Sequence, residues 1–328
     1  MNRLLQSVHA LLRSFRLWAS VGGLAITALA ILVLLGHVPM PAVQTFDRLN
    51  QDHRLRWQPP EFEPRVLIVD IDEKSLQEQG RWTWPRRTLA RLVERIVDEG
   101  RARVLGFDIV FAEPEPAGDL SLAEAIRSRP VVLGYYFSRQ AGARRIGRLP
   151  SSVFEGDVFD GWLLPQWDGF GANQERLSDA ARSSGFYNAQ LDDDGVVRSV
   201  PVLTLFNGQV YESLALAMLR VYGDNPPIAL DGQLLSLDAQ TRLPLARDLT
   251  ARVPFAGQAG PQAGRFEYIS ATDVIEGRVD PARFRDRIVL VGDPDRVTMI
   301  GKYLSDIECD VYNREFHSIT GHYAGKRL

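Results

Sequence analysis

Hydrophobic and polar positions along the chain predict strands that alternate with helices. Residues 66–72, VLIVDID, begin as a continuous apolar run of the kind found in strands buried on both faces. In residues 82–100 apolar positions recur at helical spacing, Pro85 suits the first helical position and Gly100 suits the C-cap. Residues 103–111, RVLGFDIVF, form the next predicted strand. The short connections predict a right-handed, parallel strand–helix–strand unit.

The same alternation continues through most of the chain. The turn DDDG separates two predicted strands, and a turn at NG and a helix follow. A later strand runs into a helix that Ser270 or Thr272 could cap, and IVLVG is a final buried strand. Residues 138–175 have weak periodicity and predict a long excursion. We therefore predict an α/β fold with a mixed sheet.

The N-terminal part of the chain has a different pattern. Residues 17–35, LWASVGGLAITALAILVLL, carry no charge and are long enough to cross a bilayer as a helix. Three arginines and no acidic residue precede them, so the positive-inside rule keeps residues 1–16 in the cytoplasm. The alternatives are a buried helix and a cleaved signal peptide, although GHVPMPAVQ offers no good small-x-small cleavage site. We predict an uncleaved, single-pass anchor in the inner membrane over 17–37, with the rest of the chain outside.

Composition narrows the possible functions. With 328 residues, 45% of them hydrophobic and 24% charged, the chain is long enough for one large or two ordinary folded domains. A net charge of −3 gives no general reason to expect a nucleic-acid partner. The single cysteine, Cys309, excludes an internal disulfide framework and a cysteine-rich zinc site. The five histidines show no ligand spacing, so we predict neither a metal nor a cofactor.

Two aspartates at the end of the first predicted strand are the first candidates for chemistry. Asp70 and Asp72 fit the DxDx[TV] loop of haloacid-dehalogenase-type phosphotransferases, but Lys74 occupies the Thr/Val position. Together with Asp108 they also imitate the acidic residues of phosphorelay receivers. Both chemistries use a later lysine to hold phosphate charge, and residues 75–301 contain no lysine. Catalysis at these aspartates is therefore not predicted.

A structural role is the main alternative for the same residues. Asp72 together with Ser75 can satisfy loop amides, as aspartates commonly do at the start of a helix. A nearby arginine can pair with Asp108. Under this interpretation the carboxylates stabilise the loop and bind nothing.

The segment VLIVDIDEKSL, followed by GRWTWPRRTLARLVERIVDEG and GFDIVF, resembles the type-two CHASE domain, a sensory extracellular module of bacterial receptors. The resemblance continues to SATDVIEGRVDPARFRDRIVLVG and covers about residues 46–291. It implies a periplasmic or extracellular sensor and not an enzyme. Residues that match the family's signature positions become candidates for sensing a ligand: Asp70, Asp72, Glu73, Trp84, Arg86 and Asp108.

The same resemblance implies partners. In such receptors the domain is followed by further membrane helices and a cytoplasmic cyclase or kinase. The expected partners are the membrane, an undefined external stimulus, and a second copy or a partner receptor chain. A purely structural module of the cell envelope is the alternative function.

Residues 292–328 depart from that family and resemble the beginning of a nucleoside phosphorylase. The motif GDPDR, the REF element and a strand pair around a Gly-Lys turn carry this resemblance. It implies phosphate binding by Gly292 and Arg296, and an arginine, Arg314, that can reach a neighbouring subunit. The base-binding and ribose-binding parts of a phosphorylase are absent, so we expect no catalysis. We interpret the tail as a fused fragment on a truncated or chimeric receptor that lacks its usual output and C-terminal membrane helices.

Overall fold

The computed structural model divides the chain into two compact units, Met1–Gln58 and Pro59–Leu328. The structure describes residues 20–32, 62–140, 142–154, 159, 162, 164–190, 192, 197–253 and 265–292, and the backbone of strands at 305–313, 316–323 and 326–327.

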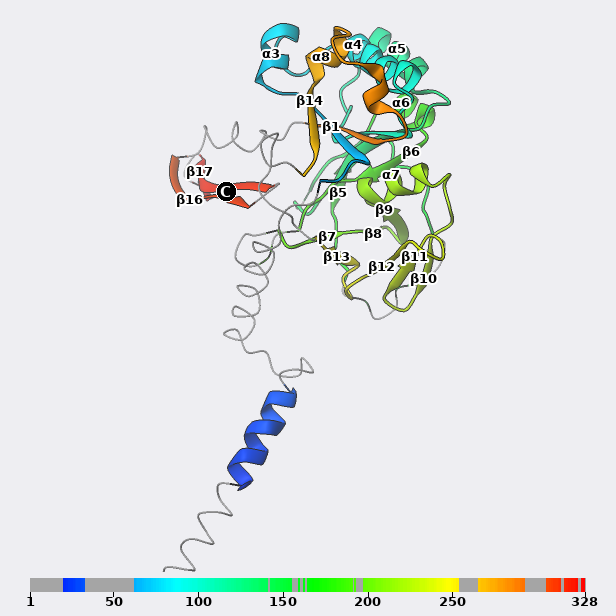
Figure 1. Ribbon diagram of the computed structural model, residues 1–328. Helices are drawn as coiled ribbons and strands as arrows, with labels where there is room; N and C mark the ends of the chain where they lie inside the picture. Colours follow the sequence, from blue (N-terminus) through cyan, green and yellow to red (C-terminus); the bar gives the residue numbers. More distant parts are fainter. Residues whose placement is uncertain are drawn as a thin grey trace, which may run out of the picture. The chain divides into compact units, whose positions relative to one another are not determined.

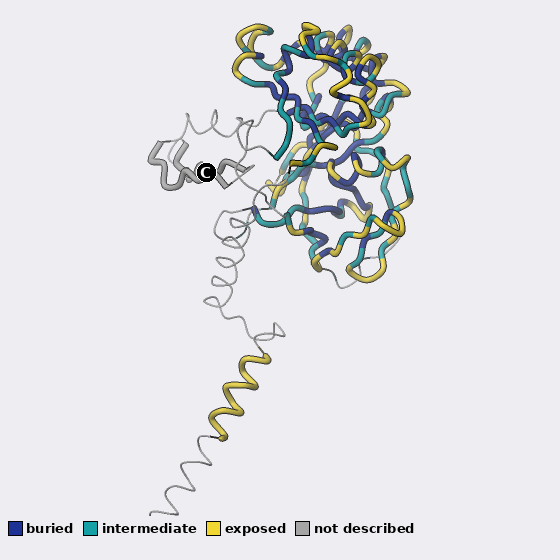
Figure 2. Tube along the Cα trace, in the orientation of Figure 1, coloured by how far each residue is buried: buried dark blue, intermediate teal, exposed yellow. Residues whose placement is uncertain are grey.

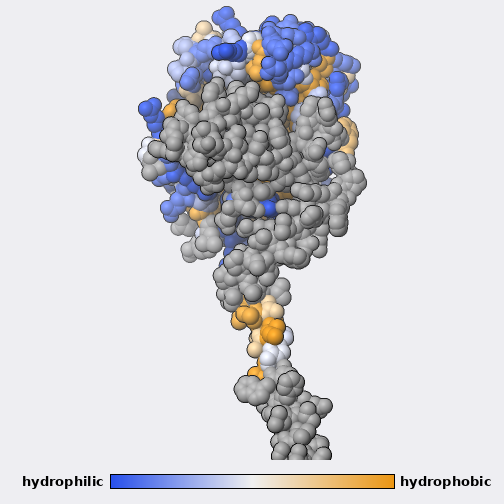
Figure 3. Space-filling model, turned by 90° about the vertical axis from the view of Figure 1, so that its left-hand side faces the viewer, coloured by the Kyte–Doolittle hydropathy of each residue, from blue (hydrophilic) through white to orange (hydrophobic). Residues whose placement is uncertain are grey.

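In the first unit, residues 20–32 form an α-helix in which every residue is exposed. Most of its surface is hydrophobic (Figure 3), and Leu24 and Ile26 are 72% and 71% exposed. Within the described part of the chain, no helix combines the length and the apolar character that a membrane crossing requires. Both ends of the span predicted at 17–37 lie outside the described residues, so that span stays a prediction.

The second unit is built on an eight-stranded sheet in the order β14-β1-β15-β2-β3-β5-β4, in which β6 also pairs with β3 (Figure 1). The strands are β1 (Val66–Asp70), β2 (Val104–Phe107), β3 (Val131–Ser138), β4 (Arg145–Ile146), β5 (Gly169–Gly171), β6 (Ser183–Phe186), β14 (Glu267–Ser270) and β15 (Ile288–Gly292). All the pairings among β14, β1, β15, β2, β3 and β6 are parallel, whereas β5 is antiparallel to β3. The predicted mixed α/β sheet is therefore confirmed.

Helices cover the sheet because alternate strand residues point to opposite faces. On one face, Leu67, Leu105 and Val289 join a buried cluster with residues from most of the helices. On the other face, Val104 packs with Met218 of α7 (Leu214–Tyr222). Figure 2 shows the buried chain between these layers. The remaining helices are α3 (Glu73–Gln79), α4 (Arg86–Val93), the π-helix η1 (Glu94–Glu99), α5 (Pro116–Ile126), α6 (Glu175–Ala180), α8 (Ala271–Ile275) and the 3-10 helix η2 (Pro281–Phe284).

Two predictions about the first strand–helix–strand unit are corrected. A strand buried on both faces is wrong for β1, because Leu67 and Val69 are fully buried whereas Val66 and Ile68 are only partly buried. The reason is that α7 packs against β2, β3 and β6. The helix predicted to start at Pro85 begins one residue later, at Arg86, and has its C-cap at Gly100 as predicted, but it becomes π-helical after Val93. The strands β1 and β2 lie in one parallel sheet as predicted, but β15 lies between them.

Smaller sheets form a second layer below α7 in Figure 1. The predicted NG turn is confirmed, since Asn207 and Gly208 have φ angles of 51° and 75° and join β8 to β9. Leu216 of α7 packs into the apolar cluster of this layer, so α7 has apolar neighbours on two sides. The strands are β7 (Ser199–Pro201), β8 (Leu203–Phe206), β9 (Gln209–Glu212), β10 (Ala229–Asp231), β11 (Leu234–Ser236), β12 (Arg242–Pro244) and β13 (Thr250–Arg252).

The tail contains a separate antiparallel sheet. It consists of β16 (Ser305–Asn313), β17 (Phe316–Tyr323) and β18 (Lys326–Arg327), in that order. Tyr323 of β17 pairs with Lys326 of β18.

The close approach of α7 to β6 predicts a strong effect of one methyl group. A Cβ added at Gly185 would lie 2.5 Å from both Cα and the backbone nitrogen of Leu214. Because backbone atoms cannot swing away, we expect Gly185→Ala to lower the free energy of unfolding by about 2 kcal/mol or more. Gly223→Ala is the matched control, because its nearest contact would be 3.6 Å and its φ is −91°. Urea unfolding of both variants checks this, and equal stabilities would contradict it.

Candidate functional site

The carboxyl ends of β1, β15 and β2 lie side by side at one edge of the sheet. Asp70, 7% exposed, pairs in register with Gly292, and Asp108 donates its backbone N–H to the carbonyl of Val291 at 2.9 Å. A Cβ added at Gly292 would lie 3.4 Å from the Cβ of Asp108. The structure thus brings together three residues that the sequence proposed, at the edge where open parallel sheets bind ligands.

Asp72 organises the junction between β1 and α3. Its Oδ1 accepts hydrogen bonds from the backbone N–H of Ser75 at 2.8 Å and from the Ser75 hydroxyl at 2.6 Å. It therefore caps the N-terminus of α3, as a helix-capping aspartate does. This confirms the prediction that Asp72 and Ser75 satisfy loop amides.

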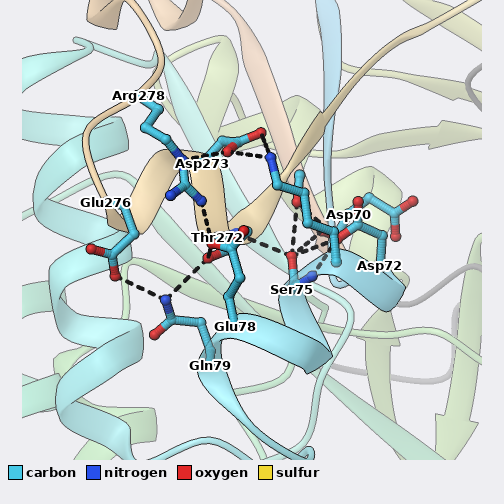
Figure 4. Close-up of polar contacts among 11 residues, drawn as sticks. Asp70, Asp72, Ser75, Glu78, Gln79, Thr272, Asp273, Glu276 and Arg278 are labelled. Carbon is cyan, nitrogen blue, oxygen red and sulfur yellow. Dashed lines mark hydrogen bonds and ion pairs between the residues drawn. The ribbon is translucent and has the colours of Figure 1, made fainter.

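The same carboxylate oxygen also reaches the second strand–helix junction, between β14 and α8. Ser270 donates its hydroxyl to Oδ1 of Asp72 at 2.8 Å, and the hydroxyl of Ser75 accepts from the backbone N–H of Thr272 at 3.0 Å. Ser270 occupies the N-cap position of α8, but its side chain makes no capping hydrogen bond there. The cap predicted from Ser270 or Thr272 is instead supplied by Ser75 of α3. The two helix starts are therefore hydrogen-bonded to each other (Figure 4).

A chain of charged side chains continues this contact outward along α3 and α8. Lys74 bonds both carboxylate oxygens of Asp273, at 2.6 and 2.8 Å, and Arg278 bonds Asp273 and Glu78. Gln79 completes the connection by donating to Thr272 and to Glu276 (Figure 4). The hydrogen bond from Lys74, then that from Arg278, lowers the pKa of Asp273, and those from Arg278 and Thr272 lower the pKa of Glu78.

The other candidates at 73–86 do not join the sheet edge. Glu73 is exposed on α3, where Gln77 donates to it at 3.4 Å. Trp84 is 1% exposed, donates its ring N–H to the carbonyl of Gly80 at 2.8 Å, and stacks edge-on against Trp82. Trp84 is therefore a core residue that anchors the loop between α3 and α4.

Arg86 is also buried, at the start of α4. It is 7% exposed, lies over the ring of Phe111 at 4.6 Å, and forms an ion pair with Asp119 of α5 at 3.4 Å. It further donates to the carbonyl of Glu113 at 3.3 Å. These contacts hold the starts of α4 and α5 together. They leave the side chain of Arg86 enclosed by the fold.

Hydrogen bonds within the fold occupy Oδ1 of Asp72 at the junction between β1 and α3. One oxygen of Asp72 accepts three hydrogen bonds, so it is not available as a base. In the described residues, no group of three or more His, Cys, Asp or Glu side chains could hold a metal ion.

The comparisons with known proteins identify the family. A family model for the CHASE2 domain matches residues 25–298. The chain belongs to the CHASE2 family. CHASE2 domains are sensory domains, typically extracellular parts of membrane receptors, and are not catalytic. This is consistent with the sensor predicted from the sequence. Neither the curated proteins nor the solved structures contain a match to the chain.

The CHASE2 match includes Gly292 and Arg296 at the start of the tail but not residues 299–328. Of the three residues proposed to bind phosphate there, Gly292 closes the strand β15 of the CHASE2 sheet. Arg296 and Arg314 lie outside the described residues. The comparisons do not support the resemblance of the tail to a nucleoside phosphorylase, and phosphate binding there stays a prediction.

Several residues of the α3–α8 contact carry no signal in the sequence. Asp273, Arg278 and Glu78 are ordinary surface residues in their own segments, and Lys74 and Asp273 are 199 positions apart. Arg86 was singled out, but its partner Asp119 was not. Such pairs become visible only when the sheet places their segments together.

The capping role of Asp72 predicts a measurable loss of stability. Asp72→Ala removes the cap of α3 and leaves the Ser75 and Ser270 hydroxyls without their shared acceptor. We expect the free energy of unfolding to fall by about 2 kcal/mol. Glu73→Ala, next to it and exposed, changes it by less than about 0.5 kcal/mol. Asp72→Asn, which keeps an acceptor, should lie between; similar values for all three in chemical denaturation would refute the capping role.

The ion pairs between α3 and α8 predict that the stability of the fold depends on pH. The pKa values of Asp273 and Glu78 in the folded chain lie below their ordinary values of 3.8 and 4.5. The stability that these ionised carboxylates contribute is therefore fully present above the ordinary values and is lost as the pH falls through the lowered pKa values. Arg278→Ala should therefore lower the Tm at about pH 7 but have a smaller effect near pH 3. Arg242→Ala, an exposed arginine without an ion pair in the described residues, serves as the control. An Arg278→Ala effect that is equal at both pH values would show that these pairs do not stabilise the fold.

Proposed function

We propose that this chain is the membrane-anchored sensory part of a bacterial signal-transduction receptor of the cyclase or kinase class. Its CHASE2 domain lies in the periplasm or outside the cell, residues 17–37 cross the inner membrane, and residues 1–16 lie in the cytoplasm. The observation that carries this proposal is an uncharged, largely apolar helix at 20–32 in which every residue is exposed, and within which the match to a sensory family begins.

The energetics of this helix support a nonpolar environment. A helix that is apolar on all sides belongs in a protein core or a membrane. Each large aliphatic side chain left in water forgoes roughly 1.5–3 kcal/mol of burial. The helix exposes six of them, namely Val21, Leu24, Ile26, Leu29, Ile31 and Leu32. A bilayer buries these side chains, and the arginines ahead of the helix fix its orientation.

The α/β domain supports a sensing role over a catalytic one. Its strongest candidate carboxylate, Asp72, is occupied by hydrogen bonds within the fold. Its helices α3 and α8 are joined through polar contacts that a bound ligand or a neighbouring chain can rearrange. The stimulus is received outside and passed to membrane helices of the receptor, in a homo-oligomer or with a partner receptor chain.

Labelling from outside the cell tests the location. On a Cys309→Ser background, Ala239→Cys places a thiol in the exposed bend between β11 and β12. A membrane-impermeant maleimide applied to intact cells should label this thiol, because the domain lies outside the inner membrane. The matched control is Ser7→Cys on the same background, which should be labelled only after lysis. The reverse pattern, or labelling of both only after lysis, would overturn the proposal.

A further inference from the structure

A second polar site lies at the opposite edge of the sheet from Asp70 and Asp108. It is a cavity of about 430 Å³, within the usual size range of small-molecule sites. Its walls come from the segment 148–153, the end of α6, the beginning of β6, the end of β9, and α7. Because β6 runs parallel to β3 and begins at Ser183, the cavity lies at the amino-terminal edge of the parallel strands.

The cavity contains a buried carboxylate with one unused oxygen. Glu212 is 4% exposed, and its Oε1 accepts from Arg220 at 2.8 Å and from the hydroxyl of Ser183 at 3.4 Å. Its Oε2 is buried and has no hydrogen-bond partner in the described part of the chain. Buried polar atoms are normally paired, and a missing partner is costly. Desolvation raises the pKa of Glu212, so a cationic donor beside Oε2 would favour the ionised form.

The same cavity also presents Arg182, a cation for which the described residues supply no ion pair. Three arginines line it, but Arg220 is held by Glu212, and Arg148 is held by Glu175 and Asp179 at 2.6 and 3.1 Å. Arg182 is exposed and forms no ion pair with any residue that the structure describes. Arg182 and Glu212 both line the cavity, so one site contains an arginine and a carboxylate oxygen that have no polar side-chain partner among the described residues.

We propose that this cavity binds a free α-amino acid, whose carboxylate pairs with Arg182 and whose ammonium group draws the buried Oε2 of Glu212 toward the cavity and donates to it. A zwitterion satisfies both groups at once. A simple anion leaves Oε2 of Glu212 unpaired and is repelled by it, whereas a simple amine leaves Arg182 unpaired and gains only one charge-assisted contact. The hydroxyl of Ser151, an exposed residue in the wall, supplies a further polar contact without adding charge. Binding stands on this geometry alone, whereas its role as the receptor's stimulus rests on the proposed function.

Binding is tested on the full chain purified in detergent. The probes are the individual proteinogenic L-amino acids at millimolar concentration, with propionate and propylamine as probes that carry only one of the two charges. At least one amino acid should raise the Tm, with saturable heat in calorimetry, and neither single-charge probe should do so equally well.

Two variants and one control locate the site. Arg182→Ala and Glu212→Gln should each weaken the affinity about tenfold or more, because each removes one charge-assisted contact. Arg127→Ala removes an exposed arginine outside the cavity and should leave the affinity unchanged. Arg182 lies at the surface, so its variant stays informative even if Glu212→Gln unfolds.

Three results would overturn the proposal. They are the absence of any Tm rise, an equal rise with propionate or propylamine, and unchanged affinity in Arg182→Ala. If the chain is labelled from outside but binds no amino acid, only the binding site proposed here is overturned. If the chain binds an amino acid but is labelled only after lysis, the proposed sensor role is overturned and the binding site is retained.

Discussion

One carboxylate oxygen, Oδ1 of Asp72, joins two strand–helix junctions that lie 198 positions apart in the chain. It caps α3 and holds the hydroxyl of Ser270, while Ser75, bonded to the same oxygen, caps α8. The ends of β1 and β14 are therefore fixed to each other beyond their backbone pairing. The charged contacts between α3 and α8 extend from this point. The acidic motif of the CHASE2 domain thus has a mechanical explanation in this chain that requires no substrate.

The parts of the fold that could be predicted are those with a local signal. The periodicity of 82–100 indicated a helix, and the NG turn indicated the β8–β9 hairpin. The placement of β15 between β1 and β2 could not be predicted, because Val66 pairs with Ile288 and no local pattern encodes a partner so distant. The incomplete burial of β1 has the same origin, since it depends on which strands α7 covers.

The candidate site was predictable to a similar degree. Parallel strands bring their carboxyl ends to one edge, so Asp70 and Asp108 follow from the strand assignment. The burial of Trp84 and Arg86 does not follow, because α5 supplies Asp119 and the loop after β2 supplies Phe111. Nor does any motif mark the cavity around Glu212, whose lining residues come from four helices and strands and from the segment 148–153. Ligand sites formed by tertiary neighbours in this way leave little trace in a single sequence.

The position of β15 has a consequence for how the domain is made. Its neighbours β1 and β2 are synthesised early, but the strand that pairs with both of them ends only at residue 292. Until β15 has been synthesised, the facing edges of β1 and β2 have no strand to pair with. Contacts between segments so far apart in sequence also form slowly. The domain therefore cannot complete its fold while its later part is still being synthesised. Because β15 is the last strand of this sheet along the chain, the strand that completes the middle of the sheet is also the last of the sheet to be synthesised.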